Sequence, residues 1–301
     1  MTARVDPTKS SSACCRDLRA RSRRSRPGAR RPQAVAQRGT TAISPPTLRL
    51  LGPVELGSST ATVSLGGPKQ QAVLALLACA GRAVSADRLI AQLWAEGPAP
   101  SKPKRTLHVY VSTLRKALAP FGLRIVGSGQ DYRLEGPREL VDLCRFEDLL
   151  TRAGELAPRR PDRALAVYDE ADRLWRGTPF SLLPDLDDLV VAAICLTSRQ
   201  LSATEARLEL AIEYGDLDDA VGELERFVAE HPLRERAVAA LMLGRYRQGR
   251  QTEALAAYTD VRHALGEELG LDPSPALREL ERQILLHTVP SPRAAARPHA
   301  A

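Results

Sequence analysis

The stretch KPKRTLHVYVSTLRKAL, residues 102–118, holds the side chains of this chain that are best placed to bind an anion. It contains five lysines and arginines and one histidine. Apolar residues recur in it at the spacing of a single helix face, at Leu107, Val111, Leu114 and Leu118. This spacing predicts a helix that buries one side in a core and exposes a basic side. Because Lys and Arg neutralise phosphates, a nucleic-acid backbone is an anion that suits such a helix.

The predicted outer face of this helix combines basic residues with small ones. The residues with the reach to contact phosphates are Lys102, Lys104, Arg105 and Lys116. The candidates for contacts with base edges in a major groove are Arg105, His108, Val109, Ser112, Thr113 and Arg115. Val109 would meet a thymine methyl group, and packing against a sheet is the alternative for this side chain. For the whole face, the alternative is a solvated basic surface.

A β-hairpin is predicted directly after the basic helix. Residues 123–126 and 132–134 alternate apolar and polar side chains around a Gly-Ser-Gly turn. Arg124 and Arg133 on its strands could reach a minor groove, where arginine suits a narrow, electronegative site. A solvated hairpin is the alternative.

The elements before the basic helix are those that would position it. Short alternating stretches from Thr47 predict two or three strands, and helices follow from Pro68 to Gly81 and from the N-cap Ser85 to Gly97. Strands, three helices and a hairpin within about 90 residues have the order of a winged helix, in which the third helix enters the major groove.

The second half of the chain predicts a helical repeat. Gly215 and Gly249 are 34 residues apart, as are Ala220 and Ala254, which is the period of tetratricopeptide (TPR) repeats. We therefore predict a mainly α protein with an α+β front. The expected domains are a disordered basic tail, a winged helix, a TPR-like domain and a second tail, over residues 1–46, 47–136, 137–288 and 289–301.

Charge is divided between the two halves. Residues 1–46 carry 11 Lys and Arg against 2 Asp and Glu, and residues 47–136 carry 11 against 5. Residues 137–288 reverse the balance, with 19 against 29. A basic front and an acidic back indicate that only the front meets a polyanion.

Several classes of protein are disfavoured by what the motifs lack. The five cysteines form no CxxC pair, and His108 has no second ligand at metal spacing, so we expect reduced thiols and no metal. No apolar run approaches the length of a membrane span, and the Arg-rich start lacks the core of a secretory signal. No catalytic or nucleotide-binding motif is present, so we expect a cytoplasmic protein that is not an enzyme and uses no cofactor.

Long phrases of the chain resemble the Streptomyces antibiotic regulatory protein (SARP) family. They include LRLLGPVEL, TLHVYVSTLRKAL, LWRGTPFSLLPD and AEHPLRERAVAALMLGRYRQGRQTEALAAYTDVRHALGEELGLDPSP, and the resemblance runs from residue 48 to residue 286. It implies a winged helix of the response-regulator output type followed by a bacterial transcriptional activator domain. It also implies an activator of secondary-metabolite (antibiotic) genes that binds direct repeats in promoters, contacts RNA polymerase holoenzyme and dimerises on DNA.

The chain departs from the family pattern at two positions of the predicted interface. Thr113 stands where relatives often have a basic residue, which would change a base or phosphate contact. Asp131 stands where a glycine is common, and we expect Asp131 to accept the positive φ of such a position.

A helical-repeat scaffold for protein binding is the alternative function, with only non-specific affinity for nucleic acid. For the activator, the concave surface of the repeat domain is the candidate for contacts with polymerase or a second protomer. The predicted contact residues there are Tyr168, Tyr246, Tyr258 and the arginines of residues 245–250, with ordinary core and surface roles as the alternative.

Overall fold

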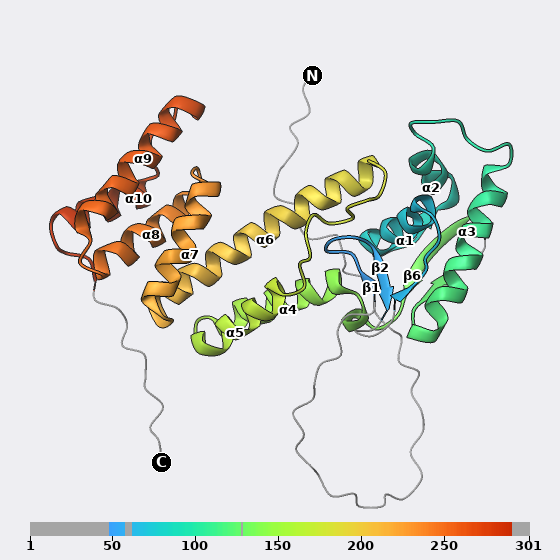
Figure 1. The fold of residues 1–301 in the computed structure, drawn as a ribbon, viewed down its shortest axis with the longest axis horizontal. Coiled ribbons are helices and arrows are strands. Elements are labelled where there is room, and N and C mark those ends of the chain that lie inside the picture. Colours follow the sequence, from blue (N-terminus) through green and yellow to red (C-terminus); the bar gives the residue numbers. More distant parts are fainter. Residues whose placement is uncertain (1–47, 58–61, 128, 291–301) are drawn as a thin grey trace, which may run out of the picture. The chain divides into compact units, whose positions relative to one another are not determined.

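The computed structural model describes residues 48–57, 62–127 and 129–290. The predicted basic tail 1–46 and residues 291–301 lie outside these ranges. The chain forms two compact units (Figure 1). Of the described residues, the first unit contains those between 48 and 148 together with 173–197, and the second contains 149–172 and 198–290.

The first unit has the element order of a winged helix, as predicted. Its first sheet has the antiparallel order β1-β2-β3, from β1 (Leu48–Arg49), β2 (Glu55–Gly57) and β3 (Thr62–Val63). The helices are α1 (Pro68–Ala80), α2 (Ala86–Leu93) and α3 (Pro103–Leu118). The second sheet has the order β4-β6-β5, from β4 (Val84–Ser85), β5 (Arg124–Val126) and β6 (Asp131–Glu135).

Helix α2 begins as predicted and ends earlier than predicted. The Ser85 hydroxyl accepts a hydrogen bond from the Arg88 backbone N–H at 3.2 Å, which caps the helix. The expected end at Gly97 is wrong, because the helix stops at Leu93. Trp94 leaves the helical conformation, and its ring stacks on Tyr110 with 6.4 Å between centroids.

The hairpin after α3 has a neighbour that the sequence pattern did not indicate. Strand β4 pairs with β6 in the register Val84 to Tyr132, which joins the start of α2 to the hairpin. The hairpin forms with Asp131 in place of the glycine, as predicted, although Asp131 lies in β6 and has no positive φ. The positive φ values of the turn belong to Gly127 (112°) and Gly129 (82°).

A buried carboxylate holds the first sheet to the start of α4 (Asp142–Leu156). Asp142 is 1% exposed and accepts backbone N–H groups of Leu50 at 2.8 Å and Leu51 at 3.0 Å. Burial raises the pKa of Asp142 from 3.8 to about 6, while these backbone hydrogen bonds and the charge of Arg176 act in the opposite direction.

The segment 173–197 also packs within the first unit. The backbone N–H of Arg176 donates to the carbonyl of Leu51 at 2.8 Å. From α2, Arg88 donates two hydrogen bonds to the carboxylate of Asp188, both at 3.0 Å. These contacts extend past the predicted boundary at residue 136, and the domain limits themselves stay a prediction.

The second unit is built from helices. Besides the end of α4 it contains α5 (Pro161–Asp172), the larger part of α6 (Asp187–Tyr214), α7 (Leu217–Glu230), α8 (Glu235–Arg247), α9 (Gln251–Leu269) and α10 (Pro275–Leu285). Ala164, Ala220 and Ala254, the small residues of the three similar segments, are at most 3% exposed. Small residues at these positions let neighbouring helices approach closely, which agrees with a TPR-like arrangement.

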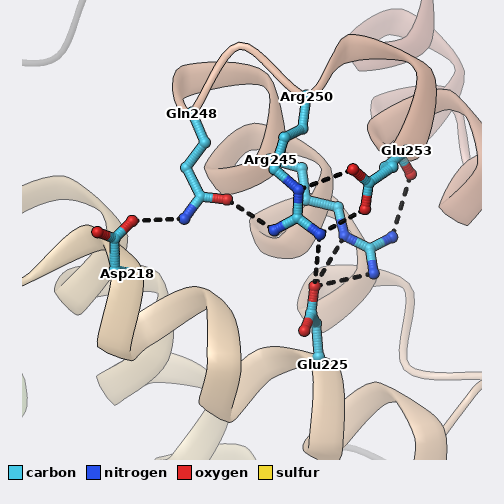
Figure 2. A network of polar contacts seen from close by, with 6 residues as sticks. All are labelled: Asp218, Glu225, Arg245, Gln248, Arg250 and Glu253. Carbon is cyan, nitrogen blue, oxygen red and sulfur yellow. Dashed lines mark hydrogen bonds and ion pairs between the residues drawn. The ribbon is translucent and has the colours of Figure 1, made fainter.

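Arginines of the second unit are held by its own acids. Glu225 of α7 accepts hydrogen bonds from Arg245 at 3.1 Å and from Arg250 at 3.3 Å, and Arg250 also pairs with Glu253 (Figure 2). Gln248 joins Arg250 to Asp218 in the same network. Two of the arginines predicted as contact residues, Arg245 and Arg250, therefore already bind side chains of α7 and α9, and the third, Arg247, binds Glu213 of α6.

The tyrosines predicted as contact residues divide in two. Tyr168 and Tyr258 are at most 9% exposed and belong to the helical core, so their predicted contact role is wrong. Tyr246 is half-buried, and its hydroxyl lies 3.4 Å from Nδ1 of His287.

Candidate nucleic-acid interface

Helix α3 buries the stripe that the sequence predicted. Leu107, Val111, Leu114 and Leu118 are at most 1% exposed. Pro103 stands in the first turn, where its missing N–H costs nothing. The opposite face is thereby fixed towards solvent.

Three cations on the outer face of α3 are available for a ligand. Lys102 at the N-cap, Arg105 and Lys116 are exposed, and none of their charged side chains has a hydrogen-bond or ion-pair partner among the described residues. Lys104 differs, since its ammonium lies 3.1 Å from Asp87 of α2. Both partners of this pair are more than 70% exposed, so the pair is weak and Lys104 can exchange Asp87 for a phosphate.

The small residues of α3 lie on the same outer face. Val109 is 56% exposed, so the alternative that it packs against a sheet is wrong. Ser112 and Thr113 are also exposed. The Thr113 hydroxyl donates to the carbonyl of Val109 at 3.1 Å, which leaves its oxygen able to accept a hydrogen bond.

Two of the predicted base-edge residues face the hairpin. Arg115 donates from Nε to the carbonyl of Ile125 at 2.8 Å and from Nη2 to the carbonyl of Gly127 at 2.7 Å. The His108 ring lies edge-on to Tyr132, with 6.2 Å between centroids. The structure therefore separates these two residues from the group on the outer face.

The two hairpin arginines share one carboxylate, which the sequence analysis missed. Arg124 donates to Glu135 at 3.0 Å, and Arg133 pairs with the other oxygen of the same carboxylate. Burial alone would raise the pKa of Glu135, but the hydrogen bonds from both arginines hold it below its usual value. A detectable signal was present, because Arg133 and Glu135 are two residues apart and share one face of the strand.

Metal-ligand clusters and membrane-spanning helices are both absent from the described residues. Within them, no group of three or more His, Cys, Asp or Glu side chains is arranged to hold a metal ion. None of their helices is both long and apolar enough to cross a membrane.

Comparison with known proteins agrees with this architecture. Residues 61–126 match the model of "Transcriptional regulatory protein, C terminal", and residues 141–285 match "Bacterial transcriptional activator domain". The chain is 40% identical to the regulatory protein AfsR of Streptomyces griseus over 78% of its own length, which spans 24% of AfsR. It is 34% identical to the transcriptional regulator RedD of Streptomyces coelicolor, over 79% of this chain and 70% of RedD.

A solved structure shares the fold. Mycobacterium tuberculosis EmbR, determined in complex with a low-affinity phosphopeptide, superposes with a TM-score of 0.76. The two sequences are 35% identical, and the match covers 82% of this chain and 67% of the EmbR chain.

A winged helix with a cationic third helix, followed by a helical activator domain, defines a class of bacterial transcriptional regulators. Within that class, the chain belongs to the Streptomyces antibiotic regulatory protein family.

Proposed function

We propose that this chain is a sequence-specific, DNA-binding transcriptional activator that controls a secondary-metabolite gene cluster. The observation that carries the proposal is the outer face of α3, where Lys102, Arg105 and Lys116 stand exposed beside small residues. Similarity to AfsR and RedD supports the regulatory role.

The roles within α3 follow from side-chain chemistry. Lys102, Lys104, Arg105 and Lys116 neutralise phosphates and set the position of the helix on the duplex. Ser112 and Thr113 exchange hydrogen bonds with base edges, and Val109 contacts a thymine methyl group. In this arrangement the cations supply affinity and the small residues supply sequence preference.

The predicted TPR-like domain acts through protein contacts. Residues 137–288 carry 19 Lys and Arg against 29 Asp and Glu, so this part of the chain is repelled by a phosphate backbone. We assign it contacts with RNA polymerase holoenzyme and with a second protomer on promoter direct repeats. The protein performs this role in the cytoplasm, without a cofactor and without catalysing a reaction.

A mobility-shift titration tests the proposal, using the DNA upstream of the chain's own coding sequence and sheared genomic DNA as competitor. We expect the complex to survive competitor at physiological salt. Arg105→Ala and Lys116→Ala should each weaken binding and make the salt dependence shallower by about 0.9 in log–log slope per phosphate contact. Arg226→Ala, which removes an exposed arginine of α7, is the matched control and should change neither.

Loss of the complex under competitor would contradict sequence-specific binding. If wild type and variants then lose affinity together as salt is raised, the chain is a helical-repeat scaffold with non-specific affinity only.

A further inference from the structure

Arg115 connects α3 to the hairpin that follows it, which we call the wing (residues 124–127 and 129–135). Two of the three nitrogens of its guanidinium donate to main-chain carbonyls of the wing, those of Ile125 and Gly127. We propose that Arg115 is a positioning residue that fixes the wing against α3 and does not read a base. This inference rests on the proposed DNA-binding function and assigns Arg115 a role within it.

The two carbonyls are suited to fixing the angle of the wing. Ile125 lies in β5, and Gly127 lies where the chain leaves that strand to turn. Gly127 has a φ of 112°, and a Cβ atom at this position would overlap the backbone oxygen of Asp131. The turn is therefore tightly folded, and the carbonyl of Gly127 has a defined place. A bidentate arginine on both carbonyls constrains the wing more than one hydrogen bond would.

His108 supports the same flank of α3. It precedes Arg115 by seven residues, so both side chains leave the helix on one side. Its Nε2 atom would lie 3.0 Å from a Cβ placed on Gly129, which puts the imidazole against the far end of the turn. The wing thus rests on two side chains of α3 that are two helical turns apart.

The wing carries the groups that would benefit from being positioned. Arg124 is 74% exposed at its side chain and Arg133 is 41% exposed, and both bind Glu135. Their triad keeps a net positive charge, because one carboxylate faces two guanidinium groups. A wing held at a fixed angle presents this charge to the duplex beside the groove that α3 occupies, and a loose wing spreads it over many orientations.

A double-mutant cycle in the full chain separates positioning from base contact. The probe is a duplex selected by wild type from a random-sequence pool. Arg115→Lys keeps the positive charge but cannot donate to both carbonyls at once in the way that the guanidinium does. We therefore expect the affinity for the selected duplex to fall roughly tenfold, equivalent to about 1.4 kcal/mol. In a background with Arg124→Gln and Arg133→Gln the same change should cost less than about twofold, because the wing has already lost its cations.

Independent losses that multiply would overturn the proposal and return Arg115 to a direct DNA contact. A second readout needs no DNA: Arg115→Lys should speed hydrogen exchange of the wing amides, with the α1 amides unchanged. Unchanged wing exchange would also refute the positioning role. If wild type selects no duplex, the proposed function fails, while the exchange measurement still decides whether Arg115 holds the wing.

Discussion

The packing of the second unit makes a quantitative prediction at Gly244, in the last turn of α8. A Cβ atom added there would lie 2.6 Å from Cγ2 of Val221 in α7 and 2.8 Å from Cδ1 of Ile212 in α6. Both distances are too short for carbon atoms in contact, so Gly244→Ala must displace the side chains of Val221 and Ile212 or the helices that carry them. Gly222, inside α7, is the matched control, since nothing lies within 4 Å of an added Cβ.

The two substitutions are expected to change the free energy of unfolding in opposite directions. Overpacking a well-filled core costs about 1–3 kcal/mol. Replacing a helical glycine by alanine returns about 0.5–1 kcal/mol. Gly244→Ala should therefore lower the free energy of unfolding by up to ~2 kcal/mol. Gly222→Ala should raise it by about 0.5–1 kcal/mol.

Urea unfolding followed with two probes measures this difference. Circular dichroism reports the helices, and tryptophan fluorescence reports the first unit alone, because Trp94 and Trp175 both lie there. We expect the Gly244→Ala effect in the dichroism transition. If Gly244→Ala stabilises the chain as much as Gly222→Ala does, α8 is not packed as closely as described.

Three further predictions concern the first unit. Because the folded-state pKa of Asp142, about 6, exceeds its ordinary value of 3.8, the folded chain binds this proton more tightly. The contribution of this proton to the free energy of unfolding is complete below about pH 4. It falls by roughly 3 kcal/mol as pH rises through 6. Urea unfolding at a series of pH values, with Asp142→Asn for comparison, measures this loss. Arg88→Asp removes the ion pair with Asp188, so it should lower both the melting temperature and the affinity for the selected duplex. Adding Asp188→Arg exchanges the two charges and should restore both quantities in part. Adding Asp187→Arg should restore neither. Glu135→Gln releases both wing arginines, so binding titrations should show tighter binding at low salt and a steeper salt dependence.

Local patterns predicted the elements that present the interface. The stripe of α3 follows from a period of 3.6, and the start of α2 follows from a serine that caps its first turn. The end of α2 was not predictable in this way, because the stacking of Trp94 on Tyr110 is a contact between elements.

The candidate interface was predicted less completely than the fold. Residue type and helical phase correctly placed Lys102, Arg105 and Lys116 on the exposed side of α3. They gave no indication that Arg115 binds main-chain carbonyls, because every residue has a carbonyl and the spacing of side chains does not show which carbonyl an arginine will meet. An arginine on a basic helix is therefore equally consistent, from sequence, with a ligand contact and with an internal one.

The predicted boundary at residue 136 followed the end of the predicted hairpin, whereas the packing is decided by buried groups that need a hydrogen-bond partner. The backbone N–H groups of Leu50 and Leu51 are buried, and the carboxylate that accepts them comes from Asp142. A buried donor left without an acceptor costs about 1–3 kcal/mol, so the first sheet depends on this residue. The bond from Arg88 of α2 to Asp188 adds a second dependence on the later chain. The winged helix is thus completed by residues that follow it in sequence, and its stability is tied to segments of the activator domain.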